Sequence, residues 1–234
     1  MPVGIIINVL SVVIGGLIGS VVKDRMPERY KENLNMIFGL ASMGMGIGSI
    51  VLMRNMPAVI FSLIAGTCLG MAVHLGEKIT SLAGKMQKMM GMNDSSNAAQ
   101  LVTVIVLFCA SGTGIYGSLV SGMNGDHSIL IAKSILDLFT ALIFACALGK
   151  AVSMIAVPQA VIMLALFFLA GVIVPLTTPE MIDDFKACGG FIMVATGFRI
   201  LQLKQFPTAD MIPAMILVMP LSWAWMTYII PLLG

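Results

Sequence analysis

Charged side chains are scarce in this sequence. Its 234 residues include 13 Lys or Arg and 11 Asp or Glu, so that 10% are charged, whereas a soluble domain carries roughly 25%. So few charges cannot cover the water-exposed surface of a soluble protein of this size. Disorder is also excluded, because a disordered chain is poor in apolar residues and this one is 59% hydrophobic. Of the broad classes of protein, the composition therefore leaves an integral membrane protein.

Several functional signatures are absent as well. The sequence has no GxSxG, HExxH or Walker motif, so we expect no catalytic activity. Its net charge of +2 comes from scattered basic residues, which argues against a nucleic-acid partner. The four cysteines lie singly in apolar runs without CxxC or Cys/His spacing, and we interpret them as small buried hydrophobes. We therefore expect no metal site and no cofactor.

Long apolar runs are what the sequence does contain. About 20 such residues cross a hydrocarbon core of about 30 Å. We predict an all-α polytopic membrane helix bundle, with residues 1–234 as a single integral membrane domain of eight transmembrane helices: 3–22, 34–53, 57–76, 100–121, 130–152, 155–175, 185–203 and 211–232. Between the third and fourth spans, basic and apolar residues alternate at near-helical spacing. We predict that residues 77–99 form an interfacial amphipathic helix and a loop at the cytoplasmic surface.

The distribution of basic residues predicts an orientation. Ten of the 13 Lys and Arg residues fall on the same side of an eight-span chain: Lys23, Arg25, Arg29, Lys31, Lys78, Lys85, Lys88, Lys150, Arg199 and Lys204. Loops rich in Lys and Arg stay in the cytoplasm. We therefore expect a multi-pass protein of the bacterial inner (plasma) membrane, with the lipid bilayer as a partner and both termini outside, in the periplasm.

A weak internal repeat is visible. Shifting the sequence by 150 positions aligns GLASMGMGIGSIVLMRNMP with GGFIMVATGFRILQLKQFP, which places Gly39 on Gly189 and Pro57 on Pro207. Spans 2 and 3 would then correspond to spans 7 and 8 in the opposite direction. Inverted repeats recur in transporters, but apolar helices also align by chance and a duplication alone does not establish transport.

The densest polar group within the spans begins in the fourth. Ser111, Gly112, Thr113 and Gly114 form a polar, weakly helical stretch. It could break the helix and expose carbonyls and hydroxyls to an ion or small solute. Alternatively, the small residues let helices approach closely while the hydroxyls bond back to their own helix.

Lys133 and Asp137 are four residues apart and share one face of the fifth span. Asp137 lies about 10 Å inside that span at 1.5 Å per residue, whereas Lys133 is expected to snorkel toward the outer interface. The pair is either an internal salt bridge or an ion or proton site in which Lys133 is the internal counter-cation. Asn8, at a similar depth in the first span, would complete such a site or hydrogen-bond between helices.

Small residues four apart recur in three predicted spans: Gly15 with Gly19, Gly44 with Gly48, and Gly66 with Gly70. Such Gly-rich faces allow close helix packing within one chain or association into a homo-oligomer.

The motifs GTGIYGS, SGMNGD and LIAKSILD, together with Asn8 and the late segment ACGGFIMVATGFRI, resemble the YqgA-like family of uncharacterised bacterial inner-membrane proteins, a domain of unknown function. The resemblance covers nearly the whole chain. This sequence differs from the family pattern at two places: Gly112-Thr113-Gly114 stands where Gly-Pro-Met is expected, and Ala160 follows Gln159 where glycine is expected. The resemblance implies a compact multi-span inner-membrane protein and supplies no substrate.

We therefore expect a transporter or channel for an ion or small polar solute, with binding residues Asn8, Ser111, Gly112, Thr113, Gly114, Lys133 and Asp137. The alternative is a non-transporting membrane scaffold or regulatory protein that acts through helix–helix contacts.

Overall fold

The computed structural model describes residues 1–22, 27–89, 98–109 and 111–233. Every regular element in these ranges is a helix and none is a β-strand, which confirms the predicted all-α class. Lys23 and Arg25 of the first loop lie outside the described residues, as do residues 90–97 of the predicted cytoplasmic segment.

The chain divides into two compact units whose segments alternate along the sequence. Unit 1 consists of Met1–Phe38 and Glu77–Gly171, and unit 2 of Gly39–Gly76 and Val172–Gly234. The first boundary falls inside one continuous helix, α2 (Glu28–Ile50).

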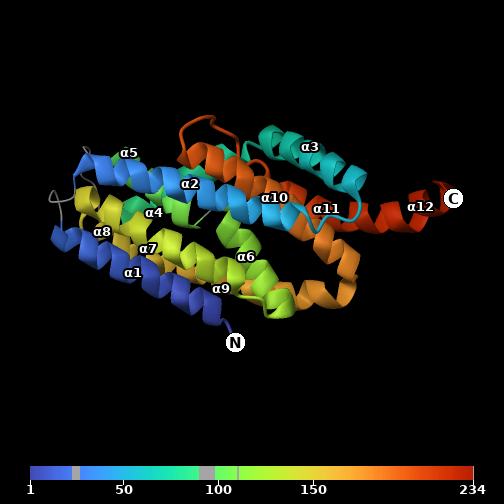
Figure 1. Cartoon of the computed structure of the whole chain (residues 1–234), viewed down its shortest axis with the longest axis horizontal. Helices are drawn as coiled ribbons and strands as arrows, with labels where there is room; N and C mark the ends of the chain where they lie inside the picture. Colours follow the sequence, from blue (N-terminus) through green and yellow to red (C-terminus); the bar gives the residue numbers. More distant parts are fainter. Residues whose placement is uncertain (23–26, 90–97, 110, 234) are drawn as a thin grey trace. The chain divides into compact units, whose positions relative to one another are not determined.

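Unit 1 contains α1 (Val3–Val22), the first part of α2, most of α4 (Leu75–Met89), α5 (Ala98–Cys109), α6 (Gly112–Asn124), α7 (Ser128–Leu148), the short α8 (Ala151–Met154) and nearly all of α9 (Ala156–Ile173). Helices α1 and α7 run side by side (Figure 1). Gly125 and Gly149 adopt positive φ angles of 74° and 63° and lie just after α6 and α7, respectively. Val12, Phe108 and Ala141 belong to a buried apolar cluster among α1, α5, α7, α8 and α9.

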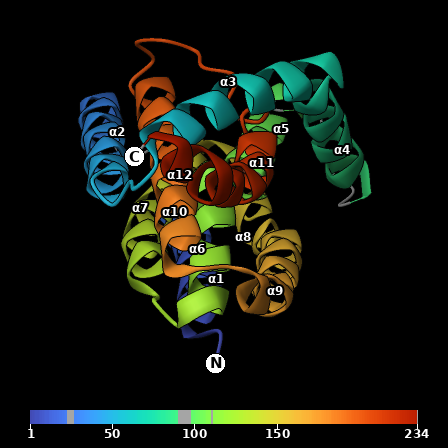
Figure 2. The same ribbon diagram turned by 90° about the vertical axis from the view of Figure 1, so that its right-hand side faces the viewer.

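Unit 2 contains the rest of α2, α3 (Met56–Ala72), the 3-10 turn η2 (Val174–Leu176), α10 (Pro179–Ile200), α11 (Ile212–Ala224), the π-helical turn η3 (Trp225–Ile229) and α12 (Ile230–Leu233). Helix α10 starts six residues before the predicted span of 185–203, because Thr178 accepts a hydrogen bond from the Met181 backbone N–H and Pro179 occupies the first turn. Helix α3 packs against α11 (Figure 2).

Close glycine contacts give the relative direction of the paired helices in unit 2. A Cβ on Gly66 would lie 2.4 Å from the Ala214 Cα, and one on Gly70 would lie 2.1 Å from the Asp210 carbonyl oxygen. Residue numbers rise on α3 as they fall on α11, so the two helices are antiparallel. By the same reasoning α2 is antiparallel to α10, because Gly39 faces Leu201 and Gly46 faces Gly190.

Four stretches of the described chain are long and apolar enough to cross a membrane: Val3–Val22, Ser128–Cys146, Ala151–Val172 and Ile212–Leu232. The count is five if α3 and the start of α4 form one bent span. Other predicted spans miss this criterion for physical reasons. Helices α2 and α10 carry several charged residues near their starts, and the fourth span is split into α5 and α6, of 12 and 13 residues.

Candidate functional site

The site in unit 1 depends on an unusually close contact between α1 and α7. A Cβ on Gly15 would lie 2.2 Å from the Leu138 carbonyl oxygen, and one on Gly19 would lie 2.1 Å from that of Leu142. Any side chain at these positions would push the helices apart. Residue numbers rise in the same direction along both helices, from Gly15 and Leu138 to Gly19 and Leu142, so α1 and α7 are parallel. This close packing brings the Asn8 side chain within hydrogen-bonding distance of Asp137.

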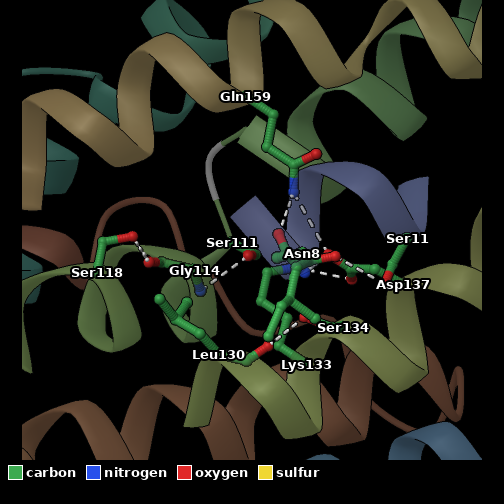
Figure 3. Close-up of polar contacts among 11 residues, drawn as sticks. Asn8, Ser11, Ser111, Gly114, Ser118, Leu130, Lys133, Ser134, Asp137 and Gln159 are labelled. Atoms are coloured by element: carbon green, nitrogen blue, oxygen red, sulfur yellow. Dashed lines mark hydrogen bonds and ion pairs between the residues drawn. The ribbon is translucent and has the colours of Figure 1, made fainter. Parts of the chain in front are cut away.

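The Asp137 carboxylate accepts three short hydrogen bonds. Lys133 Nζ donates to Oδ1 at 2.8 Å and to Oδ2 at 2.6 Å, and Asn8 Nδ2 donates to Oδ2 at 2.8 Å (Figure 3). Lys133 is 4% exposed and Asp137 is 6% exposed. The expectation that Lys133 snorkels outward is therefore wrong. The carboxylate one helical turn away holds the ammonium, because an unpaired charge in an apolar interior costs several kcal/mol.

Gln159 on α9 is the fourth member of the cluster, and sequence reasoning missed it as a site residue. Its Nε2 donates to Asn8 Oδ1 at 2.8 Å and lies 3.4 Å from Asp137 Oδ2. The only sequence signal is that Gln159 is the single polar side chain in α9. Its role comes from a contact with α1, 151 residues earlier in the chain.

One acceptor in this cluster has no donor among the described residues. Gln159 is fully buried, and its Oε1 accepts no hydrogen bond from the described part of the chain. Turning the amide over does not change this. Asn8 must direct its NH₂ group at the Asp137 carboxylate, so its Oδ1 must face Gln159. A turned Gln159 would then place oxygen against oxygen. A buried acceptor left without a partner costs about 1–3 kcal/mol, so Oε1 is suited to accept a hydrogen bond from water or from a ligand.

The interruption between α5 and α6 lies beside Lys133. Ser111 caps α6, with Oγ accepting from the Gly114 backbone N–H at 3.1 Å. A Cβ on Gly114 would lie 3.1 Å from Lys133 Cε, so the lysine stem passes directly over this glycine. On the α5 side, Lys133 Nζ lies 5.9 Å from the centre of the Phe108 ring, within the range of a cation–π contact.

The predicted residues thus fall into three groups. Asn8 and Lys133 both donate to Asp137, Gly114 and Ser111 lie beside the lysine stem, and Gly112 and Thr113 form the first turn of α6. Ser118, further along α6, donates its hydroxyl hydrogen to the Gly114 carbonyl at 2.7 Å. This hydroxyl therefore bonds back to its own helix, as in the alternative interpretation of the polar stretch.

Unit 2 buries a second carboxylate that the sequence reasoning did not single out. Asp184 Oδ1 accepts from the backbone N–H groups of Arg54 and Asn55 at 2.7 and 2.9 Å. Its Oδ2 accepts from Asn55 Nδ2 at 2.8 Å and Ser222 Oγ at 2.6 Å. Four donors saturate this carboxylate at the start of α3, where a negative charge also suits the helix dipole. This arrangement is structural.

Neither carboxylate belongs to a larger ligand cluster. Within the described ranges, no three His, Cys, Asp or Glu side chains lie together in a way that could hold a metal ion. The chemistry available in the Asp137 cluster is therefore one carboxylate, one ammonium and two carboxamides, enclosed by apolar helices.

Long apolar helices that enclose a charged pair define an integral α-helical membrane protein. The chain belongs to the family described as protein of unknown function (DUF554), which matches residues 3–223. It is 46% identical over 230 residues to the uncharacterized protein YqgA of Escherichia coli (strain K12), covering 96% of this chain and 98% of that protein. It is 25% identical over 220 residues to the uncharacterized membrane protein YdfK of Bacillus subtilis (strain 168), covering 92% and 93%. No solved structure matches the chain.

Proposed function

We propose that this membrane protein transports an ion or small polar solute, with Asp137, Lys133, Asn8 and Gln159 as the binding site. The observation that carries the proposal is the buried, unpaired Gln159 Oε1 beside an Asp–Lys pair. Ionisable groups inside lipid are costly and usually mark ion or solute pathways. A purely structural bridge gives no reason to bury a further acceptor without a donor.

In the proposed mechanism, Lys133 is the internal counter-cation. It neutralises Asp137 when the site is empty, so the helices can close over the pair without leaving a bare charge in an apolar interior. An arriving solute competes for Asp137 and displaces the lysine. The groups at the α5–α6 interruption then help to replace the hydration of the solute.

The proposal includes eight spans, a bacterial inner-membrane location, external termini and an inverted repeat of spans 2–3 and 7–8. The antiparallel packing of α2 on α10 and of α3 on α11 supports the repeat, because a two-fold axis across the helices pairs equivalent elements in opposite directions. Such repeats let a central site open alternately to each side of the membrane.

The test is flux of a panel of small ions through proteoliposomes that contain the purified full chain. Asp137→Asn should lower the flux of the transported solute about tenfold or more, since a hydrogen bond to a charged group contributes about 1.5–3 kcal/mol. Asp183→Asn is the matched control, because Asp183 pairs with Arg54 in unit 2 at 3.1 Å. If the wild-type chain moves no solute, the proposal fails. If Asp137→Asn leaves the flux unchanged, the site assignment fails.

A second candidate is a non-transporting scaffold that acts through helix contacts, and one observation favours it. Gly15 with Gly19 and Gly66 with Gly70 are used inside the chain, but a Cβ on Gly44 or Gly48 would meet no atom of the described chain within 4 Å. That face of α2 is suited to a helix of a second copy. Cross-linking through Cys introduced at position 44 should capture homo-oligomers if the scaffold interpretation is right, and the flux panel would then give no signal.

A further inference from the structure

The Asp137 carboxylate already holds a primary ammonium group, and this identifies the chemistry that it fits. Lys133 Nζ contacts both carboxylate oxygens, at 2.8 and 2.6 Å. Both ends of the pair are buried, so their attraction is little screened by water or salt. Any cation that displaces Lys133 must satisfy the same two oxygens in the same space.

The Lys133 side chain has two neighbours besides Asp137. Its stem crosses Gly114, where the missing side chain leaves room, and its Nζ lies 5.9 Å from the Phe108 ring centre. Phe108 is in the last turn of α5, which ends at Cys109. The final carbonyls of a helix lack intrahelical donors and carry partial negative charge. Ring and helix end together can hold a lysine that has left Asp137.

The groups left behind are hydrogen-bond acceptors. They are an Asp137 carboxylate oxygen and the unpaired Gln159 Oε1, since the amide hydrogens of Asn8 are directed at Asp137. A ligand that reproduces the bonds of Lys133 to the carboxylate carries positive charge and N–H donors. A quaternary ammonium has no such donors, and an anion would be repelled by Asp137. A divalent metal ion needs more oxygen ligands than one carboxylate and one amide supply.

We propose that the solute is a compact primary ammonium, either the ammonium ion or a short primary amine in its protonated form. It replaces Lys133 on Asp137 and donates a further hydrogen bond to Gln159 Oε1. This inference rests on the proposed transport function and names its substrate class. Binding exchanges one ammonium for another on Asp137, and the Phe108 ring and the end of α5 take up the added positive charge of the displaced Lys133.

The experiment uses labelled methylammonium and the full chain in proteoliposomes, with protein-free vesicles as a correction for permeation of the neutral amine. Wild-type uptake should saturate, and ammonium should compete with it while tetramethylammonium and sodium should not. Gln159→Leu should raise the KM for methylammonium about tenfold, because the bond from the charged ligand to Oε1 is lost. Ser134→Ala is the matched control, since the Ser134 hydroxyl bonds only to the Leu130 carbonyl of its own helix at 2.6 Å.

The outcomes separate the inference from the function on which it rests. Asp137-dependent flux of sodium or protons that methylammonium does not inhibit would overturn the substrate class and leave transport standing. Equal inhibition by tetramethylammonium would also overturn it, because donors would then be irrelevant. If no solute of either panel moves in an Asp137-dependent way, both proposals fail. The competition series needs only the wild-type chain, so it decides the question even if Gln159→Leu does not fold.

Discussion

Replacing Gly15 with alanine tests whether the contact between α1 and α7 builds the site. The new Cβ would lie 2.2 Å from the Leu138 carbonyl oxygen, whereas ordinary C···O contacts are about 3.3–3.6 Å. The helices must therefore separate by about 1 Å at this point. Asn8 lies seven residues away on the same helix, about 10 Å at 1.5 Å per residue.

The same separation at Asn8 would lengthen its 2.8 Å hydrogen bond to Asp137 to about 3.8 Å, beyond the range of a hydrogen bond. Overpacking costs about 1–3 kcal/mol, and loss of a hydrogen bond to a charged group costs about 1.5–3 kcal/mol. A destabilisation of about 2.5–6 kcal/mol follows. At roughly 2–4 °C per kcal/mol for a chain of this length, Tm should fall by about 10 °C.

The assay is thermal unfolding of the purified protein in detergent, followed by the loss of helical circular dichroism at one fixed scan rate. Gly44→Ala is the control, because a Cβ there meets no described atom within 4 Å. Its Tm should stay the same or rise slightly, since alanine is about 1 kcal/mol better than glycine inside a helix. If Gly15→Ala unfolds within about 2 °C of Gly44→Ala, the close contact does not hold the site and the reasoning is refuted.

Two further predictions concern the buried carboxylates. Lys133→Met alone should destabilise the protein by about 3–5 kcal/mol, because it leaves Asp137 charged and unpaired. Lys133→Met combined with Asp137→Leu should recover most of that loss in the same unfolding assay, and a double variant as unstable as the single one would contradict the coupling. Asp184→Ala should cost about 3 kcal/mol or more, because it leaves four donors without an acceptor, three of them buried. Asp183→Asn removes part-exposed ion pairs with Arg54 and Lys186 and should cost less than about 1 kcal/mol. Equal Tm losses for these two variants would show that Asp184 does not fix the start of α3.

How much the sequence predicts depends on the range of each interaction. Lys133 and Asp137 were paired correctly because a spacing of four on one helix fixes their proximity. A break in the fourth span was one of the two interpretations that the polar stretch from Ser111 to Gly114 left open, and the structure has two separate helices there, α5 and α6. Gln159 was missed as a site residue because its partners lie on other helices, and helix packing is set by shape complementarity that a single sequence does not display.

The direction of Lys133 was predicted wrongly for a related reason. The position of Lys133 near the start of α7 suggested that its ammonium points toward the membrane surface. Gly114 on α6 instead leaves space for the side chain to point toward Asp137. The number of membrane-spanning helices is also hard to predict from the sequence alone. Helix α1 matches its predicted range of 3–22, because one apolar run makes one helix. Helices α2 and α10 combine charged starts with apolar remainders, so composition alone does not decide how much of each lies in lipid.

The spacing of the site residues along the chain affects how the protein is made. Lys133 and Asp137 leave the ribosome four residues apart. Their opposite charges can therefore pair within α7 before that helix enters the bilayer. Asn8 precedes Asp137 by 129 residues, or about 6–26 s at 5–20 residues per second. During that interval α1 has a single side-chain amide to bury, that of Asn8. An unpaired amide costs much less free energy to bury than an unpaired carboxylate. Lys133 and Asp137 thus never face lipid as isolated ions, and the cluster is completed only when Gln159 emerges.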